Sequence, residues 1–163
     1  MRRSTLVILV VLGLILLIGI GVLSWVVGYR NRLVGLDEDV KTQWAQVENQ
    51  LQRRYDLIPN LVETVKGYAA HERETLENVI RARQQCIEAS GVGGQASAEN
   101  LLTGALRQLF ALAEAYPDLK ANQNFRELQE ELVSTENKIS FARQHYNNTV
   151  ENYNTAIRTF PAA

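Results

Sequence analysis

The sequence has little of what most enzymes and disulfide-stabilised proteins need. Its 163 residues include one cysteine and two histidines, so it can form neither an internal disulfide nor a cysteine-rich metal site. The 17 basic and 18 acidic residues nearly balance and are interleaved along the chain, which argues against a face for nucleic acid. Three prolines, at positions 59, 117 and 161, leave long stretches free of helix breakers. We therefore expect a helical protein with no nucleic-acid partner.

Patterns of catalytic residues are equally sparse. His71-Glu72 begins like the zinc-binding helix of a metallopeptidase, but Thr75 stands where the second histidine would be. Neither histidine follows a glutamate by three residues, as it would in a di-iron bundle. Cys86 falls on an apolar stripe, which favours a small core residue over a nucleophile. The sequence thus predicts no enzyme, with no catalytic or metal-binding residue and no cofactor. A membrane-tethered metal-dependent hydrolase using His71 and Glu72 stays open as the alternative.

What the sequence does have is one long apolar run, from Thr5 to Val27, that contains no charged residue. About 23 residues at 1.5 Å each give a helix of about 34 Å, enough to cross a hydrocarbon core. We therefore expect a short flank at 1–4 and a transmembrane anchor at 5–28 embedded in the lipid bilayer. The residues taken to mark the anchor, with the two aromatics near its interface, are Leu6, Ile8, Leu12, Leu16, Ile20, Trp25 and Tyr29.

A cleaved signal peptide is the competing interpretation of this run, because Arg2 and Arg3 give it a positively charged start. The run is longer than the apolar core of most signal peptides, which favours an uncleaved anchor. Arginines on both sides, with Arg30 and Arg32 following the run, nearly cancel the positive-inside signal. The prediction is a single-pass protein of the cell membrane, with the side of its soluble domain left open.

Beyond the anchor, residues 29–163 are expected to form one helical bundle domain. Apolar residues recur at steps of three and four, which is the period of an amphipathic helix. Pro59 predicts a break, with Asp56 as the cap of the second helix, although a single bent helix stays open. The anchor can also run directly into the first of these helices. The expected helices lie at about 30–56, 57–89, 98–115 and 121–159.

The connections between these helices are marked by glycine and proline. The segment 90–97 contains three glycines and predicts a flexible loop, with Ser97 as an N-cap and Glu99 as a charge in the first helical turn. Tyr116-Pro117-Asp118 is expected to end the third helix.

The last helix has the most regular pattern. Its apolar side alternates steps of three and four, as in a heptad seam, through Phe125, Leu128, Leu132, Thr135, Ile139, Ala142, Tyr146, Thr149, Tyr153, Ala156 and Phe160. A long helix with one apolar seam needs partners on that seam, which predicts an all-α, elongated antiparallel bundle of three to four long, coiled-coil-like helices. Many asparagines share this helix. They are either a solvated face or hydrogen-bonding residues at the edge of the seam.

The chain resembles the LemA family of bacterial membrane-anchored proteins. The resemblance is carried by the segments QRRYDLIPNLV (52–62), VKGYA (65–69), HE (71–72), YPDLKAN (116–122), LQEEL (128–132) and TENKI (135–139), and by Tyr146-Asn147, Tyr153-Asn154 and Phe160-Pro161. It implies a helical bundle behind one anchor and establishes no catalytic residue. The family's genes often neighbour membrane metallopeptidases, which implies a helper or scaffold role beside such a partner.

The expected function is therefore a non-enzymatic scaffold or adaptor at the membrane that binds a membrane protein and also assembles with copies of itself. A lipid-binding, membrane-remodelling role through the first amphipathic helix stays open. Arg53 and Arg54 are expected to be ordinary surface charges, or else a basic shoulder that docks on a partner or on lipid head groups. The candidate interaction residues are Arg53, Arg54, Asp56, Pro59, Tyr68, His71, Glu72, Tyr116, Pro117, Asn122, Asn137, Tyr146, Tyr153 and Asn154.

Overall fold

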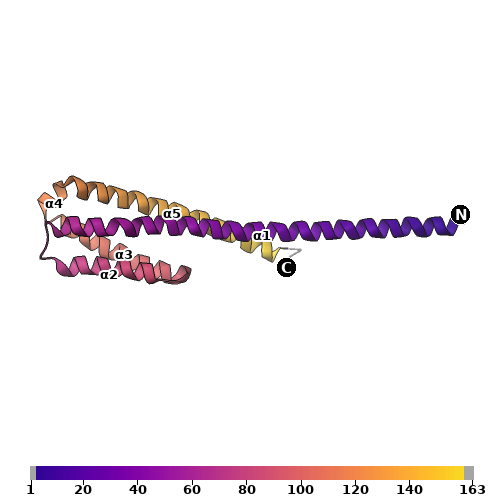
Figure 1. Cartoon of the computed structure of the whole chain (residues 1–163), viewed down its shortest axis with the longest axis horizontal. Helices are drawn as coiled ribbons and strands as arrows, with labels where there is room; N and C mark the ends of the chain where they lie inside the picture. The colour runs from indigo at the N-terminus through magenta and orange to yellow at the C-terminus, as the bar shows by residue number, and fades with distance from the viewer. Residues whose placement is uncertain (1–2, 160–163) are drawn as a thin grey trace. The chain divides into compact units, whose positions relative to one another are not determined.

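The computed structural model describes residues 3–159, and this part of the chain contains five α-helices and no strand (Figure 1). They are α1 (Arg3–Lys66), α2 (Arg73–Glu88), α3 (Gly91–Ala113), α4 (Pro117–Ala121) and α5 (Gln123–Arg158). The expected all-α class is confirmed. The side chains of residues 3–5 and the expectation for Phe160 lie outside what the structure describes.

The chain divides into two compact units. The terminal unit comprises Met1–Trp44 and Gln144–Ala163, and the bundle unit comprises Ala45–Arg143. Both α1 and α5 contribute residues to each unit.

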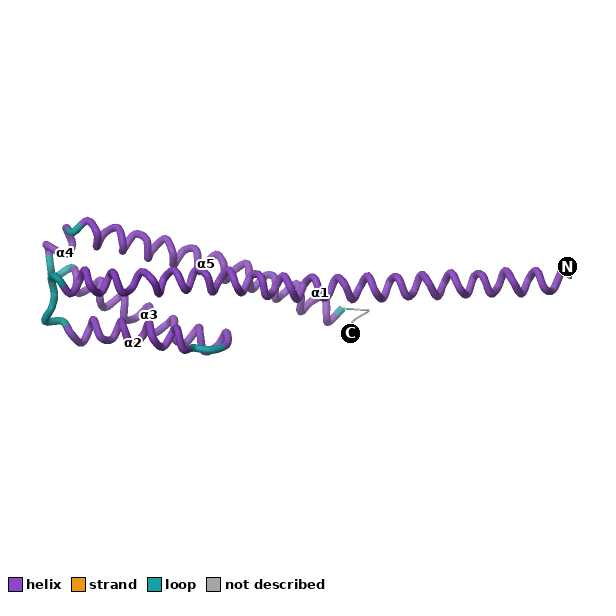
Figure 2. The backbone as a smooth tube through the Cα atoms, in the orientation of Figure 1, coloured by secondary structure: helices purple, strands orange, loops and turns teal. Residues whose placement is uncertain are grey.

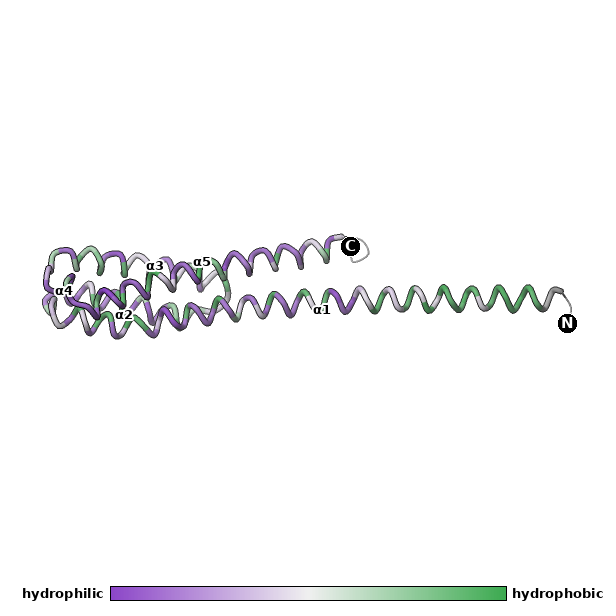
Figure 3. Tube along the Cα trace, turned by 90° about the horizontal axis from the view of Figure 1, so that it is seen from above, coloured by the Kyte–Doolittle hydropathy of each residue, from purple (hydrophilic) through white to green (hydrophobic). Residues whose placement is uncertain are grey.

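In the terminal unit, the start of α1 presents its apolar side chains outward. One segment of this helix is long and apolar enough to cross a membrane, and none of that window is buried by the rest of the chain. Figure 3 shows this stretch as an almost unbroken hydrophobic run. Six of the predicted anchor residues are more than half exposed: Leu6, Ile8, Leu12, Leu16, Ile20 and Trp25. So much apolar surface on a lone helix is suited to lipid rather than water.

Two aromatic contacts join α1 and α5 within the terminal unit. The Tyr29 hydroxyl donates a 2.6 Å hydrogen bond to the backbone oxygen of Ala156. This carbonyl lies in the last turn of α5, where carbonyls lack an intrahelical donor, so Tyr29 acts as a C-terminal cap. The rings of Trp44 and Tyr146 lie 5.1 Å apart at a tilted angle, in the range where aromatic pairs attract. Tyr29, which the sequence marked as an aromatic at the end of the anchor, therefore also stabilises the C-terminal end of α5.

The core of the bundle unit is apolar and draws on all five helices. Turns at 67–72 and at 114–116 reverse the chain at the same end of this unit (Figure 2). The largest fully buried apolar side chains of this unit are Val47, Leu51, Ile58, Leu61, Val65, Val79, Leu102, Leu109, Leu119 and Ile139.

Pro59 does not break the chain as expected. It lies inside α1, which continues to Lys66, so Asp56 is not an N-cap. The chain breaks instead at the turn 67–72, so both the expected helix at 57–89 and the alternative of one bent helix through it were wrong. A proline has no N–H, and the carbonyl four residues earlier, that of Tyr55, loses its helical donor. Arg83 of α2 replaces it, because its Nε donates a 2.7 Å hydrogen bond to the Tyr55 oxygen. A side chain from a neighbouring helix thus replaces the missing backbone hydrogen bond, and α1 stays continuous.

This repair predicts a measurable coupling between Arg83 and Pro59. We expect Arg83→Met to lower the free energy of unfolding by about 1–3 kcal/mol, because a buried carbonyl loses its donor. In a Pro59→Ala background the alanine N–H supplies that donor, so the same substitution should cost much less. Urea unfolding of the four variants in detergent micelles, followed by circular dichroism, measures the coupling. An equal cost in both backgrounds would show that Arg83 stabilises the fold in another way.

The glycine-rich segment is also different from its prediction. Only Ala89 and Ser90 separate α2 from α3, and the rest of 90–97 is helical. The reversal is made at Gly91, whose φ of 71° suits a residue without a Cβ. Ser97 is not an N-cap, since its hydroxyl donates to the Gly93 carbonyl within α3. The loop prediction was wrong because the glycines are tolerated in a helix that packs closely along α2.

The region around Pro117 contains a short helix that the sequence pattern did not predict. Pro117 stands at the first position of α4, where its missing N–H costs nothing. Asn122 then caps α5, because its Oδ1 accepts a 3.0 Å hydrogen bond from the Phe125 N–H.

The predicted seam of α5 is confirmed over the described residues. Phe125, Leu132, Thr135, Ile139 and Ala156 are buried, and the seam positions between them are half-buried. Most asparagines of the helix are exposed, namely Asn124, Asn137, Asn147, Asn148 and Asn152. The solvated-face interpretation therefore holds for them.

Candidate functional site

A charged pair lies in the middle of the apolar core of the bundle unit. Arg54 of α1 and Glu99 of α3 are 5% and 2% exposed, and the Arg54 Nη1 lies 2.8 Å from the Glu99 Oε2. The same nitrogen lies 2.9 Å from Glu136 of α5. The other terminal nitrogen donates to the Thr103 hydroxyl at 3.0 Å. Arg54 therefore joins three helices through one guanidinium.

The next residue of α1 reaches the same carboxylate. The Tyr55 hydroxyl donates to the Glu99 Oε1 and accepts a 2.6 Å hydrogen bond from the Gln95 side chain. Burial, with the hydrogen bond to Glu99, raises the pKa of Tyr55, so its hydroxyl keeps its proton and stays a donor. Both Glu99 oxygens are thus engaged by neighbouring residues of α1. We call Arg54, Tyr55, Gln95, Glu99, Thr103 and Glu136 the polar core cluster.

Cys86 borders this cluster and is buried. Burial first, and then the charge of Glu99, raises the pKa of its thiol to about 12. Because the thiolate is the nucleophile, a buried thiol with a raised pKa is a poor nucleophile at neutral pH. Cys86 accordingly behaves as the small core residue that its apolar position predicted.

A second set of polar contacts ties together the end of the bundle unit where the chain reverses. The Tyr116 hydroxyl donates to Glu72 at 3.1 Å, and the Asn122 amide donates to the Tyr68 hydroxyl at 2.9 Å. Burial and the Glu72 carboxylate raise the pKa of Tyr116, which keeps that donor protonated. These four predicted candidates therefore lie close together in two pairs, and they fasten the two turns to each other.

The remaining candidates are more scattered. Arg53 is half-exposed and forms a 2.7 Å ion pair with Glu131, while Asp56 accepts a hydrogen bond from Gln52. His71 and Asn137 are exposed, and Tyr153 and Asn154 are half-buried. Within residues 3–159 no three His, Cys, Asp or Glu side chains come together as metal ligands would. The prediction that Arg54 is a surface charge was wrong, because its guanidinium is buried among three helices.

Sequence reasoning did not single out Gln95, Thr103 or Glu136 as site residues, and it assigned Glu99 to the first turn of the third helix as a charge that the helix dipole favours. Helical spacing carried the signal for two members of the cluster. Glu99 stands three residues before Leu102 and seven before Leu106 on the buried side of α3, and Arg54 stands between Leu51 and Ile58 on that of α1. A charge at each of two seam positions indicates a buried pair, because an isolated buried charge is too costly.

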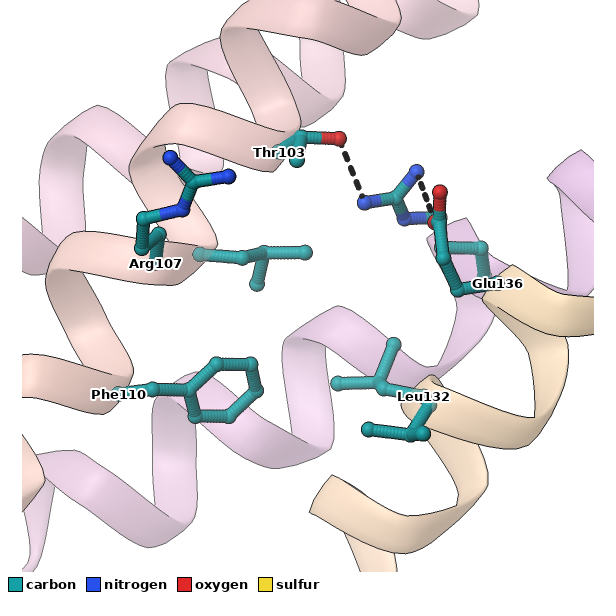
Figure 4. A pocket seen from close by; sticks show the side chains of 8 residues that line it. Thr103, Arg107, Phe110, Leu132 and Glu136 are labelled. Atoms are coloured by element: carbon teal, nitrogen blue, oxygen red, sulfur yellow. Dashed lines mark hydrogen bonds and ion pairs between the residues drawn. The ribbon is translucent and has the colours of Figure 1, made fainter.

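Grooves between the helices mark the surface of the bundle unit. Arg54, Thr103, Leu106, Arg107, Phe110, Leu132, Val133 and Glu136 line one of about 430 Å³ between α3 and α5, shown in Figure 4. A polar groove of about 470 Å³ lies between α1 and α5, and one of about 430 Å³ lies between α2 and α3. The α3–α5 groove reaches the polar core cluster at Arg54, Thr103 and Glu136.

An exposed apolar helix and a helical bundle built around a buried charged cluster define the class of protein. It is a helical protein with an apolar segment suited to membrane anchoring. The LemA family profile matches residues 43–163, and the chain belongs to the LemA family. The predicted resemblance is confirmed.

Several curated proteins are similar to this chain. The magnetosome protein MamQ of Magnetospirillum gryphiswaldense is 27% identical, over 80% of this chain and 58% of its own length. A MamQ protein of Paramagnetospirillum magneticum is 26% identical over the same shares. Protein LemA of Metamycoplasma hominis is 25% identical, over 90% of this chain and 68% of its own length. This chain thus spans less than two thirds of the two MamQ proteins.

Proposed function

We propose that this chain is a single-pass membrane scaffold that presents its helical bundle to a membrane protein partner and takes no part in catalysis. The observation that carries the proposal is the outward apolar surface of α1, which is suited to an anchor beside a bundle. The magnetosome proteins among its relatives support a role at an assembled cellular structure. A metallopeptidase partner, which the family resemblance implies, and self-assembly, which the long seam suggests, remain part of this proposal.

The outer face of α2 is the surface we assign to a partner. Ile80 and Ile87 are 51% and 46% exposed, and a spacing of seven residues places them on one side of the helix. Large apolar side chains of this kind, when they are rimmed by polar residues, are typical of protein interfaces. Gln84 and Glu88 provide such a rim, and they hydrogen-bond to each other. The described residues hold no comparable feature that favours the hydrolase or the membrane-remodelling alternative.

Site-specific photo-crosslinking in the living cell tests this assignment. A photoreactive amino acid at Ile80 should give one discrete adduct with a membrane protein, because this side chain would touch the partner. Ile87→Glu should remove the adduct, since it places a charge in the same interface. The same photoreactive group at Asn137, which is exposed on α5, is the control and should give no such adduct.

Two tagged copies of the chain in one cell distinguish the partners. An adduct that carries both tags would identify the partner as a second copy. A diffuse smear from Ile80 that resembles the Asn137 control would contradict a scaffold that acts through α2.

A further inference from the structure

We propose that the α3–α5 groove binds a medium-chain aliphatic carboxylate, that is, a free fatty acid. This ligand site is independent of the proposed scaffold role and lies on a different face from Ile80 and Ile87. Its volume of about 430 Å³ falls within the range of small-molecule pockets.

The wall of the groove suits a hydrocarbon chain. Leu106, Phe110, Leu132 and Val133 line it from α3 and α5, and Figure 4 shows the Phe110 ring and the Leu132 side chain facing the same space. The Phe110 ring is held in place by an edge-on contact with Phe125, at a centroid distance of 6.3 Å. Val133 remains 55% exposed at the rim. A short alkyl chain laid along these residues would remove apolar surface from water.

The charges of the groove favour a single negative group on the ligand. The charge of Arg54 is already balanced by Glu99 and Glu136, and its second terminal nitrogen donates to Thr103, so Arg54 does not need a charged group from the ligand. Arg107 is different, because no hydrogen bond or ion pair joins it to any residue in the described part of the chain. It stands one helical turn before Phe110, hence on the same side of α3.

An unpaired guanidinium beside an apolar wall recognises an amphipathic anion. Its planar fork matches the two oxygens of a carboxylate, and such charge-assisted pairs are stronger than neutral hydrogen bonds. A fatty acid supplies both parts, with its carboxylate at Arg107 and its chain along Phe110, Leu132 and Val133.

Octanoate is a suitable probe, since it is soluble in water. The full chain in lipid nanodiscs, labelled at Leu and Val methyl groups, should show saturable shifts at Leu106, Leu132 and Val133 as octanoate is added. Arg107→Gln should weaken binding about tenfold through the lost ion pair. Val133→Glu, a change at an exposed position, should abolish binding by repulsion of the carboxylate.

Two matched controls separate this site from general partitioning. Arg81→Gln removes an exposed arginine that lines the α2–α3 groove and should leave octanoate binding unchanged. Octanamide has the same chain without the charge and should bind about tenfold more weakly than octanoate. Equal binding of octanamide, or equal losses in Arg81→Gln and Arg107→Gln, would overturn the proposal. So would tighter binding of a short peptide that ends in a leucine carboxylate, because the groove would then recognise protein termini.

Discussion

Arg54→Met is expected to lower the free energy of unfolding by about 3–5 kcal/mol, the usual cost of removing one partner from a buried ion pair. The loss arises because Glu99 remains 2% exposed with its charge no longer balanced by the guanidinium. Thr103 and Glu136 lose the same contact. Urea unfolding of the full chain in detergent micelles, followed by circular dichroism, measures the effect.

The adjacent residue gives a matched control for this result. Arg53 forms an ion pair at the surface, where its side chain is 52% exposed and that of Glu131 is 41% exposed. Because exposed pairs contribute little, Arg53→Met should cost about 0–1 kcal/mol. The double variant Arg54→Met/Glu99→Met removes both buried charges and should recover most of the stability lost in Arg54→Met. Similar losses in Arg53→Met and Arg54→Met would mean that the buried pair does not contribute as its geometry indicates.

Ile139→Ala is the second large expected effect, a loss of about 2–5 kcal/mol in the free energy of unfolding. Ile139 is 1% exposed in the seam of α5, so the substitution removes buried methyl groups and leaves a cavity. Thermal and urea unfolding in micelles both report this loss.

Val133→Ala on the same helix is the control, since Val133 is 55% exposed. Its substitution should change stability by no more than about 0.5 kcal/mol. A cost for Ile139→Ala as small as that of the control would contradict the seam of α5.

The predictions that held follow from periodicity. The steps of three and four along α5 determined which side chains are buried, because one stripe of a 3.6-residue helix must face the core. The apolar run at the start of the chain forms a helix whose side chains are left exposed by the rest of the described chain, which suits a lipid environment. The LemA resemblance depended on ordered motifs, and the family match confirmed it.

The predictions that failed involve local propensity that tertiary contacts override. Pro59 reads as a helix breaker in isolation, yet Arg83 supplies the missing donor to Tyr55. The three glycines of 90–97 predicted a loop, yet all of them belong to α3, because packing along α2 stabilises a helix that propensity alone disfavours. In both cases the stabilising partner lies on another helix, and its approach cannot be inferred from neighbours in the sequence.

The polar core cluster shows the same division. The spacing of apolar residues places Arg54 and Glu99 on the buried sides of their helices. Each therefore needs a partner of opposite charge, because an isolated buried charge is too costly. That they meet each other, with Thr103 and Glu136 around them, depends on how α1, α3 and α5 pack. The same packing leaves Arg107 without an ion pair beside an apolar groove. The period of the apolar residues thus determined the all-α class and the inward faces of the helices. Where a helix continues through a proline or a glycine, and which charges pair, are decided by long-range contacts in the folded bundle alone.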